Sequence, residues 1–327
     1  MEIALLIIFY VFSPLLILHL CHKYKFINKL GAVFIAYVLG LIVGNIGILP
    51  VGSEQVQNIT TMLTIPLAIP LLLFSANIKE WGKLAKNTFL SLAIGITSVM
   101  VVVTIGFFLF RGKGMPEAWK LSGMLVGVYT GGTPNLAALK IMLDIDADTY
   151  VLTHTYDMAI SVAYLAFLMT IGQKVFHKFL KPFPISKTDN DEKDYDGKDP
   201  YQGMLSRKKF VPLLIALLIS VGIFGVAGGL SLLVDENQQM VVVILTITTL
   251  SIIASLIPRI NRIEKTFEAG MYLILIFSLV VASMADVSRF AGLTPGLFGY
   301  ITFAVFGSLL VHVMLSKAFK MLSLIHI

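Results

Sequence analysis

Two features of this sequence could do chemistry: an aspartate inside an apolar segment, and a glycine-rich helix break. Asp157 lies about a third of the way into the apolar stretch 148–172. A carboxylate at membrane depth is costly unless it is paired, and such residues are usually functional. His154 precedes it by three residues, which places both side chains on one face of a helix. The sequence therefore predicts an ion-coupling pair at Asp157 and His154; a structural polar contact near the helix end is the alternative.

The helix break is the run 129–135, Tyr-Thr-Gly-Gly-Thr-Pro-Asn, between two apolar arms. Adjacent glycines weaken a helix, and proline removes a backbone donor. In hydrocarbon, irregular backbone is tolerated only inside protein or beside a water-filled cavity. In transporters such breaks bind substrate or coupling ions. The predicted substrate-binding residues here are Thr130, Gly131, Gly132, Thr133 and Asn135.

Other polar residues are candidates of a second rank. Asn77 ends an apolar segment that holds two prolines, and it is assigned either to substrate binding or to a helix cap. The oxygen atoms of Asp157, Thr133 and Asn135 would suit a hard cation, so Na⁺ is the one metal considered. No other metal and no organic cofactor is expected. The acidic loop Asp144, Asp146 and Asp148 is predicted to cap the helix that follows it.

The composition indicates a membrane protein. Hydrophobic residues make up 57% of the chain and charged residues 13%, against about 25% charged in soluble domains. The apolar residues form blocks of about 20, enough to cross a bilayer. The predicted spans are 2–20, 30–48, 57–76, 88–110, 148–172, 210–233, 239–257, 268–285 and 294–316, with 117–142 as a broken segment. The predicted fold class is all-α and polytopic, a transporter-like transmembrane bundle.

The basic residues predict topology instead of nucleic-acid binding. The net charge is +6, but Lys and Arg cluster at span ends and are expected on the cytoplasmic side. If 117–142 is a re-entrant hairpin, every main basic cluster falls on that side. An odd number of crossings then precedes the polar linker 173–209, so a second copy of the unit after it would be inverted. A single broken spanning helix is the alternative. A weak similarity between 71–78 and 277–286 supports the repeat.

This organisation divides the chain into four parts. Residues 1–172 form a first transmembrane repeat with the interrupted element 117–142, residues 173–209 a cytoplasmic linker, and residues 210–321 a partial second repeat. The last six residues, 322–327, are what the end of a common transposon-based sequencing adapter encodes. They are predicted to be an artefact, and the natural protein is expected to continue.

An enzyme is not expected. The single Cys21 excludes a disulfide framework and thiolate metal sites. No phosphate-binding loop, His-rich metal cluster, CxxC motif or Gly-x-Ser-x-Gly nucleophile is present in the sequence.

Two segments, 66–79 and 127–138, resemble the DUF819 family of uncharacterised bacterial membrane proteins. That family is grouped with the cation:proton antiporter/anion transporter superfamily, which includes bile-acid and glutamate:sodium symporters. The resemblance covers residues 1 to about 320. It implies two inverted repeats, each with an interrupted helical element, and elevator-type alternating access. This chain departs from that pattern by ending before a second interrupted element.

The predicted function is Na⁺- or H⁺-coupled transport of a small organic anion across a bacterial inner membrane. A channel, or a membrane sensor or scaffold that does not transport, is the alternative. The expected partners are the lipid bilayer and a small-molecule or ion substrate, with no nucleic acid. A second copy of the chain, forming a homodimer, is also considered.

Overall fold

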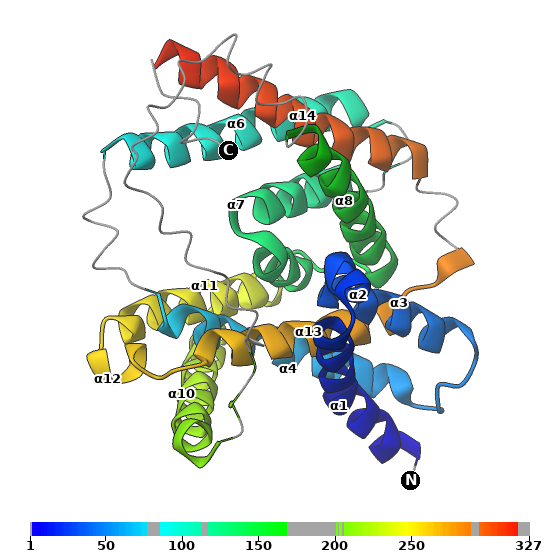
Figure 1. The fold of residues 1–327 in the computed structure, drawn as a ribbon, viewed down its shortest axis with the longest axis vertical. Coiled ribbons are helices and arrows are strands. Elements are labelled where there is room, and N and C mark those ends of the chain that lie inside the picture. The colour runs from blue at the N-terminus through cyan, green and yellow to red at the C-terminus, as the bar shows by residue number, and fades with distance from the viewer. Residues whose placement is uncertain are drawn as a thin grey trace. The chain divides into compact units, whose positions relative to one another are not determined.

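The computed structural model describes residues 2–76, 86–112, 117–168, 206–288 and 294–319, together with Met115, Tyr201, Gly203 and Met204. Within these ranges every regular element is helical (Figure 1). The chain forms two compact units. Unit 1 comprises Met1–Gly82, Thr133–Val151 and Lys198–Arg289; unit 2 comprises Lys83–Gly132, Leu152–Gly197 and Phe290–Ile327. Each unit takes segments from both sides of the predicted linker.

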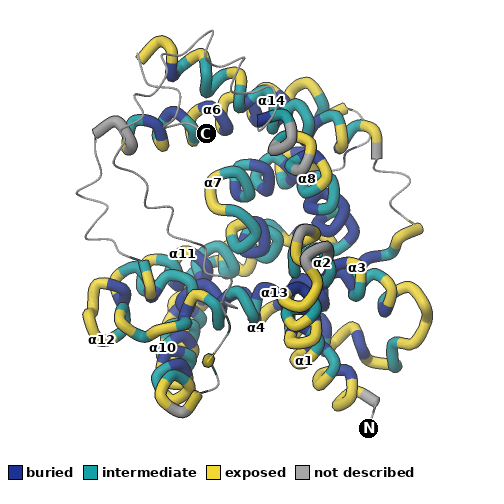
Figure 2. The backbone as a smooth tube through the Cα atoms, viewed as in Figure 1, coloured by how far each residue is buried: buried dark blue, intermediate teal, exposed yellow. Residues whose placement is uncertain are grey.

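Unit 1 is built around helix α13 (Thr266–Met284). All ten residues from Ile274 to Ser283 are buried, which is the pattern of a helix enclosed on all sides. It packs against α3 (Ala32–Asn45) and α4 (Ser53–Phe74), and α1 (Glu2–Lys23) also contacts it. Figure 2 colours buried residues dark blue, and Ile274 to Ser283 are among them. The remaining helices of unit 1 are α2 (Lys25–Leu30), α10 (Arg207–Ser231), α11 (Glu236–Ser255) and α12 (Pro258–Asn261).

Glycines let α3 approach α13 closely. A Cβ atom added at Gly40 would lie 2.4 Å from the Leu279 carbonyl oxygen, and one at Gly44 would lie 2.2 Å from the Ser283 carbonyl oxygen. Small residues four apart are a common way to bring membrane helices together. The absence of side chains at these two positions therefore sets the α3–α13 distance.

A buried polar cluster ties three helices of unit 1 together. The Gln57 amide nitrogen donates to the Ser283 hydroxyl at 2.9 Å and to the Tyr10 hydroxyl at 3.1 Å. The two hydroxyls are 2.7 Å apart. Because the three side chains satisfy one another, they can be buried among apolar helices at little cost.

The acidic loop before α8 (Ala147–Phe167) caps that helix, as the sequence predicted. The Thr149 N–H donates to the Asp146 carboxylate at 2.8 Å. Asp148 accepts a bond from the Asp286 N–H at 2.5 Å, which ties the start of α8 to the segment after α13. These carboxylates have structural partners in unit 1.

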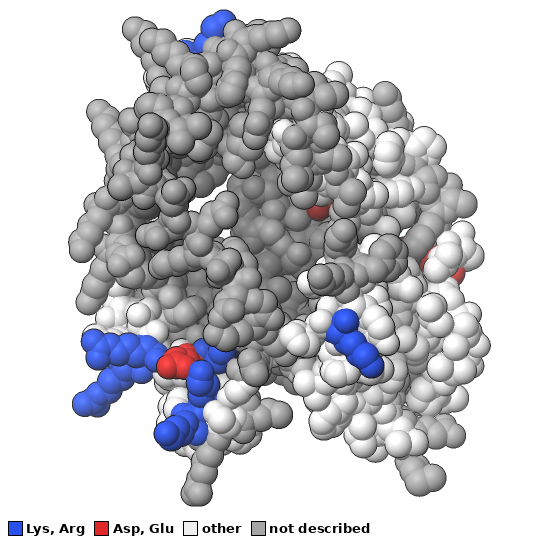
Figure 3. Space-filling model, in the orientation of Figure 1, with Lys and Arg blue, Asp and Glu red and all other residues white. Residues whose placement is uncertain are grey.

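Two basic segments meet at one end of unit 1. Lys209, at the start of α10, donates to Glu264, in the turn after α12, at 2.7 Å, and this hydrogen bond lowers the pKa of the Glu264 carboxyl. Figure 3 shows Lys and Arg side chains gathered around these helix ends. The two segments were predicted to share one side of the membrane, and the contact agrees with that.

Unit 2 contains α6 (Lys86–Phe110), the first arm of α7 (Ala118–Met142), most of α8, and α14 (Thr294–Ala318). Tyr300 on α14 links three of these elements. Its hydroxyl donates to the Val103 carbonyl at 2.9 Å and lies 2.6 Å from the Ser122 hydroxyl. Its ring covers Gly106, where a Cβ atom would approach to 2.4 Å. Leu121, Leu125 and Ile160 complete the core around it.

Seven helices of the described residues are long and apolar enough to cross a membrane. They are Ile3–Lys23, Ser53–Phe74, Phe89–Phe110, Lys208–Ser231, Gln238–Ser255, Thr266–Met284 and Pro295–Ala318. The expected span 30–48 is shorter, because α3 begins after Gly31 (φ 85°) and ends before Gly47 (φ 75°). The helix α4 continues through Pro66 and Pro70. The linker residues 173–200 and the tail 322–327 lie outside the described residues.

Candidate functional site

The predicted helix break is present and is located at Gly132. Helix α7 is interrupted there by φ 72° and ψ −160°, a backbone conformation that essentially only glycine adopts. Pro134 follows two residues later and has no N–H to donate. The sequence prediction of an interruption in 117–142 is confirmed, whereas its two topologies, hairpin and broken span, stay predictions.

The predicted substrate residues fall on both sides of this break. Thr130, Gly131 and Gly132 belong to unit 2, and Thr133 and Asn135 belong to unit 1. Gly131 and Asn135 are exposed. The Thr130 hydroxyl donates to the Val126 carbonyl at 2.7 Å.

Asn77, the other predicted substrate residue, lies outside the described residues. The structure describes the chain just before it, where α4 ends at Phe74. The Asn261 side-chain amide donates to the carbonyls of Phe74 and Ala76, at 3.0 Å each.

Asp157 and His154 lie in unit 2 on α8, and both are buried, with 6% and 3% of their surface exposed. The group that approaches the Asp157 carboxyl is the hydroxyl of Tyr129, one residue before the predicted Thr130. The Tyr129 hydroxyl and Asp157 Oδ1 are both buried, and neither has a partner within hydrogen-bonding geometry. The sequence did not predict this approach, although Tyr129 is the first residue of the predicted break 129–135.

Thr153 adds a third buried oxygen atom to the same region. It is 1% exposed, and its hydroxyl makes no hydrogen bond to protein. It precedes Asp157 by four residues, so the two side chains lie on one face of α8. This spacing is visible in the sequence, and it could have been used to predict Thr153 as a site residue. Unpaired buried oxygens are the ligands that a hard cation prefers.

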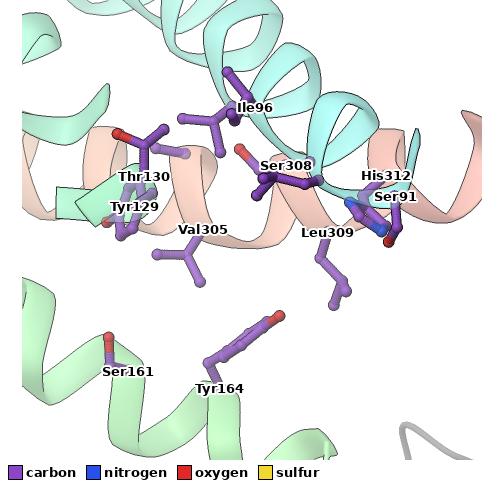
Figure 4. A pocket seen from close by; sticks show the side chains of 14 residues that line it. Ser91, Ile96, Tyr129, Thr130, Ser161, Tyr164, Val305, Ser308, Leu309 and His312 are labelled. Atoms are coloured by element: carbon purple, nitrogen blue, oxygen red, sulfur yellow. The ribbon is translucent and has the colours of Figure 1, made fainter. Parts of the chain in front are cut away.

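A cavity of about 460 Å³ opens within unit 2 (Figure 4). Tyr129 and Thr130 line it, so it adjoins the end of the first arm of α7. Its other walls come from α6, α8 and α14. Among the described residues no cluster of three or more His, Cys, Asp or Glu side chains is arranged to hold a metal ion.

Comparisons with known proteins agree with the family resemblance. The family model described as "Protein of unknown function (DUF819)" matches residues 7–327. The protein described as "Uncharacterized membrane protein YjcL", from Bacillus subtilis (strain 168), is 23% identical over 312 residues, which cover 91% of this chain and 77% of that protein. No solved structure matches the chain.

Proposed function

The chain belongs to the DUF819 family of proteins, and we propose that it is a secondary transporter that couples movement of a small organic anion to Na⁺ or H⁺. Its helices make it a multi-pass membrane protein. The proposed mechanism is alternating access in a bacterial inner membrane.

The observation that carries this proposal is the group of buried oxygens around Asp157. A buried carboxylate in an apolar helix bundle is costly when one of its oxygens has no donor. Asp157, Tyr129 and Thr153 each present an oxygen atom with no hydrogen-bond partner in the protein. A bound Na⁺ would accept coordination from these atoms, and a proton would neutralise the carboxylate. Either event would remove the cost, which is the behaviour expected of a coupling site.

The helix break supports the anion part of the proposal. The second arm of α7 begins after Gly132. As at any helix N-terminus, its first N–H groups have no carbonyl acceptor in a preceding helical turn. Such half-helix N-termini bind anionic groups in transporters with broken helices. Thr133 and Asn135 lie in this first turn. We assign them, with Gly131 and Gly132, to the substrate.

Alternating access requires bodies that can move as units. The chain has two, each with its own core, and one of the points where it passes from one to the other is Gly132–Thr133, directly at the break. A glycine pair at such a crossing is a natural hinge, because glycine absorbs changes in φ and ψ that other residues resist.

The test is uptake and counterflow of radiolabelled organic anions by proteoliposomes under imposed Na⁺ or H⁺ gradients. Asp157→Asn keeps the side-chain size but removes the charge, so uptake should lose its dependence on the ion gradient. Asp235→Asn is the matched control, because Asp235 is exposed and makes no capping hydrogen bond from its side chain. Unchanged ion dependence in Asp157→Asn would remove this assignment, and flux without counterflow would indicate a channel.

A further inference from the structure

The cavity in unit 2 has a polar end at Ser91 and His312. Its volume of about 460 Å³ is in the range of small-ligand sites, roughly 300–1,000 Å³. Four helices line it: Ser91 and Gly95 come from α6, Tyr129 from α7, Ser161 and Tyr164 from α8, and Ser308 and His312 from α14. In Figure 4, Ser91 and His312 lie at one end, and Tyr129 and Thr130 lie at the other.

Contacts between α6 and α14 place His312 at the polar end of the cavity. The two helices run antiparallel, because Gly106 meets Tyr300, Val102 meets Gly307, and Gly95 meets His312. A Cβ atom added at Gly95 would lie 3.4 Å from His312 Nδ1. The imidazole therefore lies beside the Gly95 backbone, at a distance where even an added methyl group would be in ordinary contact.

Ser308, one turn before His312, has a hydroxyl without a hydrogen-bond partner. Neighbouring hydroxyls in unit 2 donate back to their own helix: Ser98 to Ile94 at 2.7 Å, and Thr302 to Phe298 at 2.8 Å. The Ser308 hydroxyl makes no such bond, although the residue is only 8% exposed. A buried hydroxyl without a partner is costly, so this donor suits a ligand atom.

The lining sets the charge of the ligand. None of the residues that line the cavity in the described structure is Lys, Arg, Asp or Glu. His312 is the one described lining residue with an imidazole, whose N–H can donate to a ligand oxygen. A single carboxylate can be held there by an imidazole N–H and hydroxyl donors. A second carboxylate would meet no cation, and an ammonium group would meet no carboxylate.

The rest of the wall suits an aliphatic body. Leu92, Ile96, Val305 and Leu309 also line the cavity, and Figure 4 shows Val305 and Leu309 between its two ends. At about 30 Å³ for a water-sized group, the volume holds roughly fifteen non-hydrogen atoms. We propose that this cavity binds a small monocarboxylate, with its carboxylate at Ser91, Ser308 and His312 and its aliphatic part against the apolar wall. This assignment rests on the proposed function, because it names the class of anion that the transporter would carry. The cavity is then a second binding position for that anion, in addition to the helix break.

Tyr129 connects this cavity to the proposed cation site. It lines the cavity, and its hydroxyl also approaches the Asp157 carboxyl. Ser161 and Tyr164 follow Asp157 by four and seven residues, so all three lie on one face of α8. An ionised Asp157 would repel a carboxylate in the cavity, whereas a bound cation would cancel that repulsion. Binding of the two ions is therefore coupled, and the coupling is reciprocal.

Isothermal titration of the purified protein with hexanoate, hexanamide and adipate tests the ligand class. Hexanoate should bind saturably, and hexanamide and adipate should each bind at least about tenfold more weakly. Hexanamide loses a charge-assisted hydrogen bond, and adipate places its second carboxylate where it has no partner. Equal binding of hexanoate and hexanamide, or no saturable binding of hexanoate, would overturn the assignment.

Two variants test the position of the carboxylate. Ser308→Ala and His312→Gln should each weaken hexanoate binding by about tenfold. Thr302→Val is the control, because Thr302 lies on the same helix outside the cavity and bonds to its own backbone. Thermal unfolding of each variant identifies loss of fold. Wild-type affinity in a folded Ser308→Ala or His312→Gln would place the ligand elsewhere.

The same titration separates this inference from the proposed function. Na⁺ or a lower pH should tighten hexanoate binding in the wild type but not in Asp157→Asn; identical affinity under all conditions would disprove the coupling. Saturable hexanoate binding without counterflow in proteoliposomes would reject the transporter and keep the cavity assignment. Counterflow of another anion with no hexanoate binding would reject the cavity assignment and keep the transporter.

Discussion

Replacing either glycine of α3 that faces α13 should destabilise unit 1. A Cβ atom at Gly40 would lie 2.4 Å from a backbone oxygen of α13, and one at Gly44 would lie 2.2 Å from another. Ordinary contacts begin at 3.4 Å, so each alanine requires the helices to part by about 1 Å. The obstructing atoms are backbone, and they cannot rotate away as a side chain could.

Three contributions set the size of the effect. Overpacking costs about 1–3 kcal/mol. Separation also stretches the bonds that Asn45 makes across this interface, from its amide to the Ala285 carbonyl at 2.9 Å and from the Val287 N–H to its oxygen at 3.1 Å. Each is worth about 0.5–1.5 kcal/mol. Against this, alanine favours the helix over glycine by about 1 kcal/mol. The net expected loss in unfolding free energy is about 1–3 kcal/mol for either single variant.

The double variant gives a sharper test of the mechanism. Gly40→Ala and Gly44→Ala need the same separation of the same two helices, so their effects should not add. Once one alanine has moved α3 away, the second clash is already partly relieved. We expect the double variant to lose clearly less stability than the sum of the two single variants.

Thermal or denaturant unfolding in detergent micelles provides the measurement. Gly225→Ala on α10 is the matched control, because a Cβ atom there would meet nothing within 4 Å. Its stability should be unchanged or slightly raised by the gain in helix propensity. If Gly40→Ala and Gly44→Ala unfold at the same point as Gly225→Ala, the close α3–α13 packing is wrong.

Three further substitutions test other parts of the structure. Tyr300→Phe removes the hydrogen bond to the Val103 carbonyl and should lower the unfolding free energy by about 1–2 kcal/mol, measured by denaturant titration. Gln57→Leu leaves the Ser283 hydroxyl without its amide donor and should cost about 1–3 kcal/mol in the same assay. Gly132→Ala places a side chain where φ is 72° and ψ is −160°; about 1–3 kcal/mol of strain should reduce counterflow, and unchanged flux would remove the break from the mechanism.

Local features of this fold were predictable from the sequence because their causes are local. Apolar runs of about 20 residues predicted the helices, since chain length and hydropathy decide whether a segment can cross a bilayer. The break at Gly132 was also predictable, because glycine and proline act on their own backbone. The same holds for the Asp146 cap, which needs only a carboxylate before a helix.

Long-range partners could not be predicted in this way. Ser283 bonds to Gln57, 226 residues earlier in the chain, and no periodicity within either helix points to the other. The division into two units is of the same kind, since each unit combines segments from both sides of the linker. The site shows both cases: Thr153 could have been found from its spacing to Asp157, whereas the role of Ser308 depends on packing between α6 and α14.

The buried polar groups of the two units differ in how they are satisfied. In unit 1 the side chains of Tyr10, Gln57 and Ser283 bond to one another and form a closed set. In unit 2, several buried hydroxyl or carboxyl oxygens of the described residues make no hydrogen bond to protein: Tyr129, Thr153, Asp157, Ser308 and Ser316. Thr266, at the start of α13, is a similar oxygen in unit 1. Inside a membrane each such atom carries a cost that water cannot relieve. Buried polar side chains that bond to one another specify how helices pack. Buried oxygens without partners, gathered beside a cavity and a helix break, are expected where ions and substrate bind. The distribution therefore favours unit 2 as the location of the proposed coupling site.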